Sequence, residues 1–73
     1  MQANMRTLRV HAGCYVSVDG RYKIRRHKDE IRNRWVWRVF RIQEGTFEFD
    51  RTFRTLKVAR EYVSKSVSLP WEI

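Results

Sequence analysis

Arginine and lysine are concentrated in one stretch of this chain. Residues 21–41 contain nine of its sixteen cationic residues and two of its eight acids, so this stretch carries +7 of the net charge of +8. Twelve of the sixteen cations are arginine, whose planar guanidinium group binds phosphate, carboxylate and guanine edges through paired donors. Positive charge concentrated in this way is typical of a surface that binds a polyanion.

Basic and apolar residues alternate in this stretch, which places many of the cations on strands. We expect four of them to project from the sheet face opposite the apolar core and to read or hold a nucleic acid, while the others contact phosphates. The other reading is a solvated face whose charges prevent edge-to-edge strand pairing. The candidate nucleic-acid-binding residues are Arg21, Lys23, Arg25, Arg38, Arg26, Lys28, Arg32 and Arg34.

Apolar residues on the same face suggest a second kind of partner. Phe40 and Ile42 alternate with the core residues and lie beside Arg38. Aromatic residues and arginine are enriched in protein interfaces, so Phe40, Ile42 and Trp71 are candidates for a protein-binding surface. Alternatively, the C-terminal tail folds over Phe40 and Ile42 through Leu69 and Trp71.

Few residues are suited to catalysis or to metal binding. The nucleophile and base candidates are Cys14, His11 and His27, and no motif surrounds them. Two neighbouring ligands do not complete a tetrahedral zinc site, and the isolated glycines form no phosphate-binding loop. Cys14 is expected to be a small buried residue rather than a reactive thiol. We therefore expect no enzymatic activity, no cofactor and no metal.

Turn residues and periodicity divide the chain into segments. Asp19-Gly20 predicts a hairpin over residues 14–24. We expect a three-residue loop over residues 18–20, because that register separates the apolar residues of the hairpin from its cations. The following segments are a polar connection over 27–33, strands over 34–42 and 46–53, and a helix over 56–66 with Thr55 as N-cap.

These segments predict one two-layer α+β domain in β-β-β-α order, with a three-stranded antiparallel sheet packed on one C-terminal α-helix. Residues 14–66 form the core of the domain, residues 1–13 an N-terminal arm or edge strand, and residues 67–73 a tail. The Trp37 face of strand 34–42 should point inward, because the other face would bury Arg38. The expected core residues are Val16, Tyr22, Ile24, Trp37, Val39, Phe47, Phe49, Leu56, Ala59 and Val63.

The second half of the chain contains a recurring pattern, made up here of Trp35 or Trp37, Gly45, Phe53, Thr55, Leu56, Ala59, Tyr62 and Val63. This pattern resembles the arm-type DNA-binding domain of phage and transposon integrases. The plant ethylene-response DNA-binding domain is similar in architecture, and small bacteriophage proteins with a DGRY motif, here residues 19–22, look closer still. The resemblance implies a sheet that is laid into the major groove of DNA. Glu48 and Asp50 are expected on the outer face of the last strand, where a DNA-binding sheet would carry cations, so contact with the groove would be confined to the first two strands.

The predicted function is that of a small, non-enzymatic basic module that binds nucleic acid through the cationic face of its sheet, with duplex DNA favoured over RNA. The alternative is a phage-encoded effector that binds and inhibits an acidic host protein. The sequence has neither an apolar run of about 18 residues nor the apolar segment of a signal peptide. We therefore expect no membrane partner and a cytoplasmic location, in a bacterial host if the protein is phage-encoded.

Overall fold

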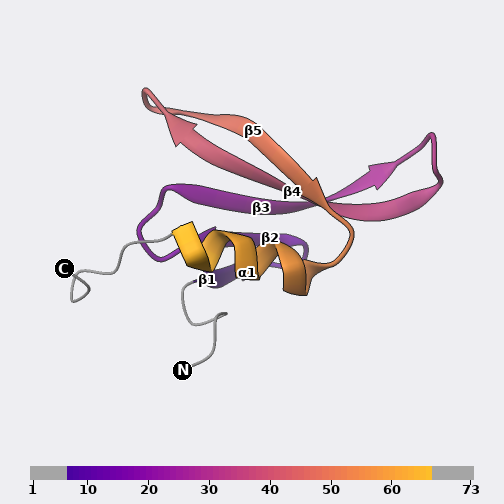
Figure 1. Cartoon of the computed structure of the whole chain (residues 1–73), viewed down its shortest axis with the longest axis horizontal. Helices are drawn as coiled ribbons and strands as arrows, with labels where there is room; N and C mark the ends of the chain where they lie inside the picture. The colour runs from indigo at the N-terminus through magenta and orange to yellow at the C-terminus, as the bar shows by residue number, and fades with distance from the viewer. Residues whose placement is uncertain (1–6, 67–73) are drawn as a thin grey trace.

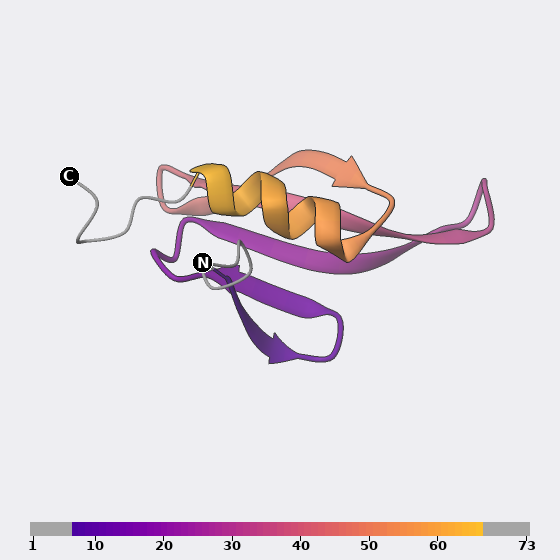
Figure 2. The same ribbon diagram turned by 60° about the horizontal axis from the view of Figure 1, so that its bottom comes forward.

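The computed structural model describes residues 7–66, which form one antiparallel sheet and one helix (Figure 1). The strands lie in chain order across the sheet, and each is antiparallel to its neighbours. The helix lies along one face of the sheet and packs against it (Figure 2). The elements are β1 (Thr7–His11), β2 (Cys14–Ser17), β3 (Tyr22–Asp29), β4 (Arg34–Gln43), β5 (Thr46–Phe53) and α1 (Leu56–Ser66).

The fold is the expected α+β arrangement of an antiparallel sheet and one C-terminal helix, but the sheet has five strands rather than three. Residues 7–11, expected as part of an arm or as an edge strand, form the edge strand β1, and the hairpin predicted at 14–24 contributes two separate strands. The polar connection predicted at 27–33 is also shorter than expected. Residues 27–29 continue β3 because they pair with residues 34–36 of β4.

The register between β2 and β3 differs from the predicted one by one residue. Tyr15 is opposite Ile24, and Val16 is opposite Lys23. Four residues therefore lie between the strands instead of three. Since opposite residues share a face, Tyr15 joins Ile24 on the helix side, and the prediction that Val16 belongs to the core is wrong.

Side-chain hydrogen bonds account for the longer turn. The Ser17 hydroxyl donates to the Asp19 carboxylate (2.6 Å) and accepts from the Tyr22 N–H (3.0 Å). The same carboxylate accepts the Arg21 N–H (3.0 Å). Gly20 adopts a φ of 75°, a left-handed conformation that glycine takes without steric cost. These bonds satisfy the turn backbone in a way that strand alternation does not encode.

Four residues with almost no exposed surface fill the space between sheet and helix: Ile24 and Val39, which are opposite each other on β3 and β4, and Ala59 and Val63, one turn apart on α1. Partly buried side chains pack around them: Tyr15, Tyr22, Trp37, Phe53, Leu56 and Tyr62. The inward orientation predicted for the Trp37 face is confirmed, as are the predicted core residues Tyr22, Ile24, Trp37, Val39, Leu56, Ala59 and Val63.

The helix begins at the predicted residue. The Thr55 side chain accepts the N–H of Val58 (3.2 Å), and the Thr55 carbonyl accepts the N–H of Ala59 (3.2 Å). The side-chain bond satisfies one of the amide groups that have no partner within the first turn of a helix. Thr55 is therefore the N-cap, and it fixes the point at which the chain leaves β5 and turns over the sheet.

One extra residue, Asp50, interrupts the alternation of β5. Val39 is opposite Arg51, but the next residue of β4, Phe40, is opposite Phe49. This is a β-bulge, in which two residues of one strand face one residue of its partner. As a result, β5 turns its side chains to different faces before and after Asp50.

The bulge overturns the prediction that Phe47 and Phe49 belong to the core. Both precede Asp50 and lie on the side away from the helix, where 37% of Phe47 and 51% of Phe49 is exposed. Phe53, which follows the bulge, is opposite Trp37 and packs against the core. Aromatic residues of a single strand thus serve both faces of the sheet.

Candidate nucleic-acid interface

The sheet face turned away from α1 is called the open face below. The buried pair Ile24–Val39 marks the helix side, so the neighbouring cross-strand pairs point to the open face. The side chains of the open face on β3, β4 and β5 are Lys23, Arg25, His27, Asp29, Arg34, Val36, Arg38, Phe40, Ile42, Phe47, Phe49 and Thr52.

Two arginines stand opposite each other at the centre of the open face. Arg25 of β3 pairs with Arg38 of β4, and like charges in this position repel. In the part of the chain that the structure describes, neither guanidinium group is in a salt bridge; the ion pair there joins Arg32 to Asp29. Arg25 and Arg38 also border a hollow of about 230 Å³ together with Arg26, His27 and Phe40. An anion bound at this hollow would relieve their repulsion.

Aromatic rings lie among these cations. Phe40 and Phe49 pack edge to face, with ring centroids 6.0 Å apart. The Arg38 guanidinium is 4.8 Å from the centre of the Phe49 ring and 5.5 Å from that of Phe40, and the Lys23 ammonium is 4.7 Å from that of Phe47. Cation–π contacts of this kind hold the charged groups over the rings. The open face therefore offers both positive charge and apolar surface to a ligand.

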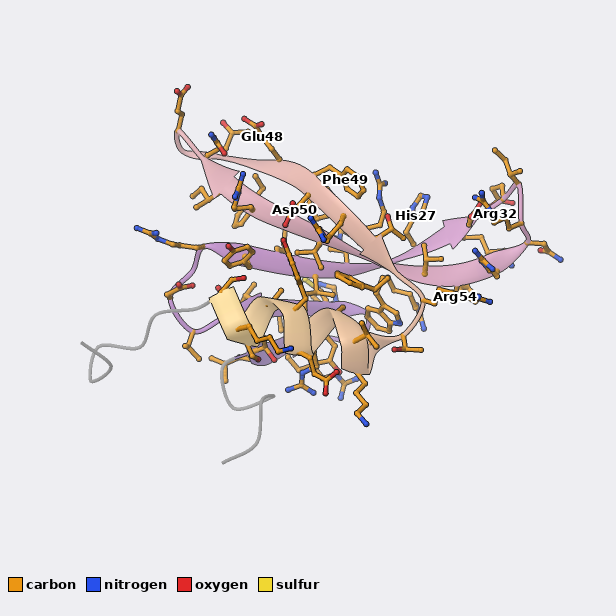
Figure 3. All side chains as sticks on the ribbon, viewed as in Figure 1. His27, Arg32, Glu48, Phe49, Asp50 and Arg54 are labelled. Carbon is orange, nitrogen blue, oxygen red and sulfur yellow. The ribbon has the colours of Figure 1, made fainter. Side chains whose placement is uncertain are left out.

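The acids of β5 do not lie on the open face, contrary to the prediction. Glu48 is opposite Arg41, which is on the same side of β4 as Val39, and the Asp50 carboxylate accepts a hydrogen bond from the Tyr62 hydroxyl of the helix (2.6 Å). Figure 3 shows Phe49 and Asp50 directed to different sides. The hydrogen bond to Asp50, followed by burial, raises the pKa of Tyr62. The bulge thus removes two negative charges from the candidate interface.

The predicted nucleic-acid-binding residues divide into three groups. Those on the open face are Lys23, Arg25, Arg34 and Arg38. Those on the helix side are Arg26 and Lys28, which follow Ile24 at two and four residues along β3 and therefore share its face. Their charged groups lie 4.8 Å and 5.4 Å from the centre of the Trp35 ring. Those in turns are Arg21 and Arg32.

The candidates for a protein interface are also placed in part. Phe40 and Ile42 lie on the open face, where Ile42 is opposite the exposed Phe47. Trp71 lies outside the described residues, as do Leu69 and the rest of the predicted tail. The structure adds Phe47, Phe49 and Arg54 to the residues that sequence reasoning selected.

Cys14 is buried, as expected for a structural cysteine. Within residues 7–66, no group of three His, Cys, Asp or Glu side chains is arranged to hold a metal ion. No helix in this range has the length and apolar character needed to cross a membrane. Neither a protein-family model nor a curated protein nor a solved structure matches the chain. The resemblance to the DNA-binding domains of integrases therefore stays a prediction.

Proposed function

We propose that this protein is a non-enzymatic module that binds nucleic acid, with duplex DNA as the favoured ligand, through the open face of its sheet. The observation that supports the proposal is the opposed pair Arg25–Arg38, which has no carboxylate partner within residues 7–66 and is flanked by Lys23 and His27. Phosphate groups of a nucleic acid supply the missing negative charge, and release of their counterions favours binding.

The position of the cations favours a duplex. They lie mainly on β3 and β4, and the far end of this strand pair extends past the start of α1 (Figure 1). A two-stranded ribbon fits the major groove of B-DNA, which is about 12 Å wide. In that position arginine side chains can bond guanine N7 and O6, while neighbouring cations hold phosphates.

The proposal is tested by fluorescence anisotropy of a labelled duplex at increasing salt concentration. Affinity should fall steeply, and Arg25→Gln should reduce the slope of log K against log salt by about 0.9, the effect of one lost phosphate contact. Lys57→Gln removes the same charge from the exposed surface of α1 and should leave the slope unchanged. A binding constant that does not vary with salt would contradict the proposal.

The second candidate function is binding and inhibition of an acidic host protein by a phage-encoded effector. The exposed side chains of Ile42, Phe47 and Phe49 beside arginine favour it, because a few buried anchors dominate most protein interfaces. A pull-down from nuclease-treated bacterial lysate separates the candidates. A protein partner should be retained after digestion and lost with Phe40→Ala far more than with Arg25→Ala, whereas a nucleic-acid ligand should disappear.

A further inference from the structure

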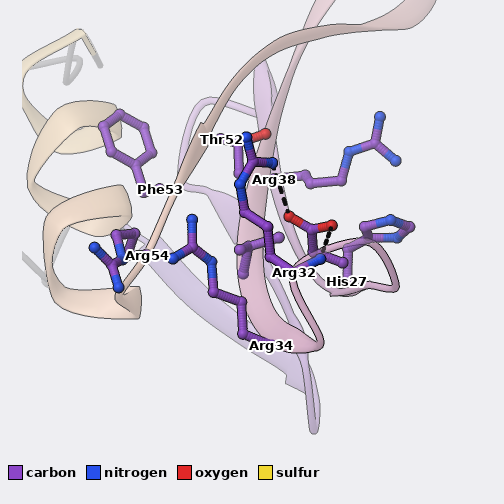
Figure 4. A pocket seen from close by; sticks show the side chains of 9 residues that line it. His27, Arg32, Arg34, Arg38, Thr52, Phe53 and Arg54 are labelled. Carbon is purple, nitrogen blue, oxygen red and sulfur yellow. Dashed lines mark hydrogen bonds and ion pairs between the residues drawn. The ribbon is translucent and has the colours of Figure 1, made fainter.

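A cavity of about 370 Å³ lies where the start of β4 meets the end of β5. Four arginines line it, together with His27 and one acid, Asp29, and Figure 4 shows their side chains around it. The four arginines come from three parts of the chain: the turn after β3, strand β4, and the connection from β5 to α1. The arginines are Arg32, Arg34, Arg38 and Arg54.

The single acid of the cavity neutralises only one of these cations. Asp29 accepts hydrogen bonds from the backbone N–H and the guanidinium group of Arg32, both at 3.3 Å. These bonds, that of the backbone first, lower the pKa of Asp29, so the carboxylate is ionised at neutral pH. The charges of Arg34, Arg38 and Arg54 are therefore not offset by an acid that lines the cavity.

Arg34 has a donor without an acceptor. Its Nε atom is buried and makes no hydrogen bond in the structure. Asp29 is directly opposite Arg34 in the register of β3 and β4, yet the Asp29 carboxylate bonds Arg32 instead. A buried donor without a partner is unfavourable, and it marks the place where an acceptor from outside the chain would be bound.

We propose that this cavity binds a phosphate group. A phosphate has several acceptor oxygens, which suit the paired donors of guanidinium groups, and its negative charge matches the excess of arginine. Thr52, which also lines the cavity, can add a hydroxyl donor. The inference rests on the proposed function for one source of the phosphate, the backbone of a nucleic acid; free inorganic phosphate is the other source.

The first experiment uses inorganic phosphate alone. Arginine Nε–H signals are followed by ¹H–¹⁵N NMR while sodium phosphate replaces sodium chloride at constant ionic strength. The Arg34 signal should shift and saturate, whereas that of Arg9, on β1 and outside the cavity lining, should not. Arg54→Gln should weaken binding roughly tenfold, the effect of losing one hydrogen bond between charged groups. The matched control Lys57→Gln should have no effect.

A second variant tests the same cavity in the opposite direction. Asp29→Asn keeps a side-chain acceptor for the Arg32 backbone N–H but removes the negative charge, so phosphate should bind more tightly. An Arg34 signal that does not respond to phosphate, in the wild type and in Asp29→Asn, would overturn the proposal.

A final comparison identifies the source of the phosphate. A DNA duplex that shifts the Arg34 signal, while its uncharged methylphosphonate analogue does not, assigns the cavity to a backbone phosphate. A response to inorganic phosphate but not to DNA assigns it to the free anion. If duplex affinity falls with salt while Arg34 responds to neither ligand, the cavity proposal fails and the proposed function stands.

Discussion

Replacing Phe49 with alanine tests whether the aromatic side chains of the open face bind a ligand or stabilise the fold. A phenylalanine side chain has roughly 150–250 Å² to bury, and 51% of Phe49 is exposed. A ligand that covers the exposed half removes about 100 Å² from water, which corresponds to about 2.5 kcal/mol at most. We therefore expect Phe49→Ala to lose about 2 kcal/mol of binding free energy, or roughly 30-fold in affinity.

The same substitution should have a small effect on stability. Truncating a fully buried phenylalanine costs about 3–5 kcal/mol because it leaves a cavity. Phe49 contacts Phe40 and Arg38 on one side only and is open to solvent on the other. We expect a loss of about 1 kcal/mol in the free energy of unfolding, measured by urea denaturation, because little enclosed space is left.

The control for this prediction is Val63→Ala in the core between the sheet and the helix. Val63 has no exposed surface and does not lie on the open face, so Val63→Ala should lower stability and leave the affinity of the folded protein unchanged. The reasoning is refuted if Phe49→Ala destabilises the protein like a core substitution while binding of the folded fraction is unaltered.

Two further predictions concern the contacts of the helix. Thr55→Ala should lower the free energy of unfolding by about 1 kcal/mol, since it removes the N-cap bond to Val58; Thr46→Ala, on the exposed start of β5, serves as control in the same urea titration. The hydrogen bond to Asp50 raises the pKa of Tyr62 above 10.0, so the unfolded chain loses the phenol proton first as pH rises. This contribution to stability is complete below pH 10.0 and is lost as pH rises through the pKa of the folded state. Tyr62→Phe should remove that pH dependence, and identical profiles for both proteins would contradict it.

The elements with strong local signals were predictable from the sequence. The predicted helix at 56–66 and strand at 46–53 have the same bounds in the structure, because an N-cap and the alternation of apolar and polar residues act within a few residues. The placement of Lys23, Arg25 and Arg38 on one face was predictable for the same reason: each follows from its spacing to a buried neighbour.

The features that were missed depend on single-residue offsets and on tertiary contacts. The Asp50 bulge and the longer turn around Asp19 each shift a strand by one residue, and such a shift moves every following side chain to the other face. Arg51, which interrupts the apolar side of its strand, was the one local sign of the bulge. Arg54 lines the proposed phosphate cavity only because the chain turns from β5 into the helix beside β4. No local sequence pattern encodes this turn.

The bulge also has a consequence for how this protein can diverge. Before Asp50, β5 supplies side chains to the open face, the proposed ligand-binding surface; after it, Phe53 belongs to the packed interior. Under the proposed function, natural variation at Phe47 and Phe49 alters selectivity at a small cost in stability. Relatives of this protein that recognise different ligands would be expected to differ in the first half of this strand and to agree in the second.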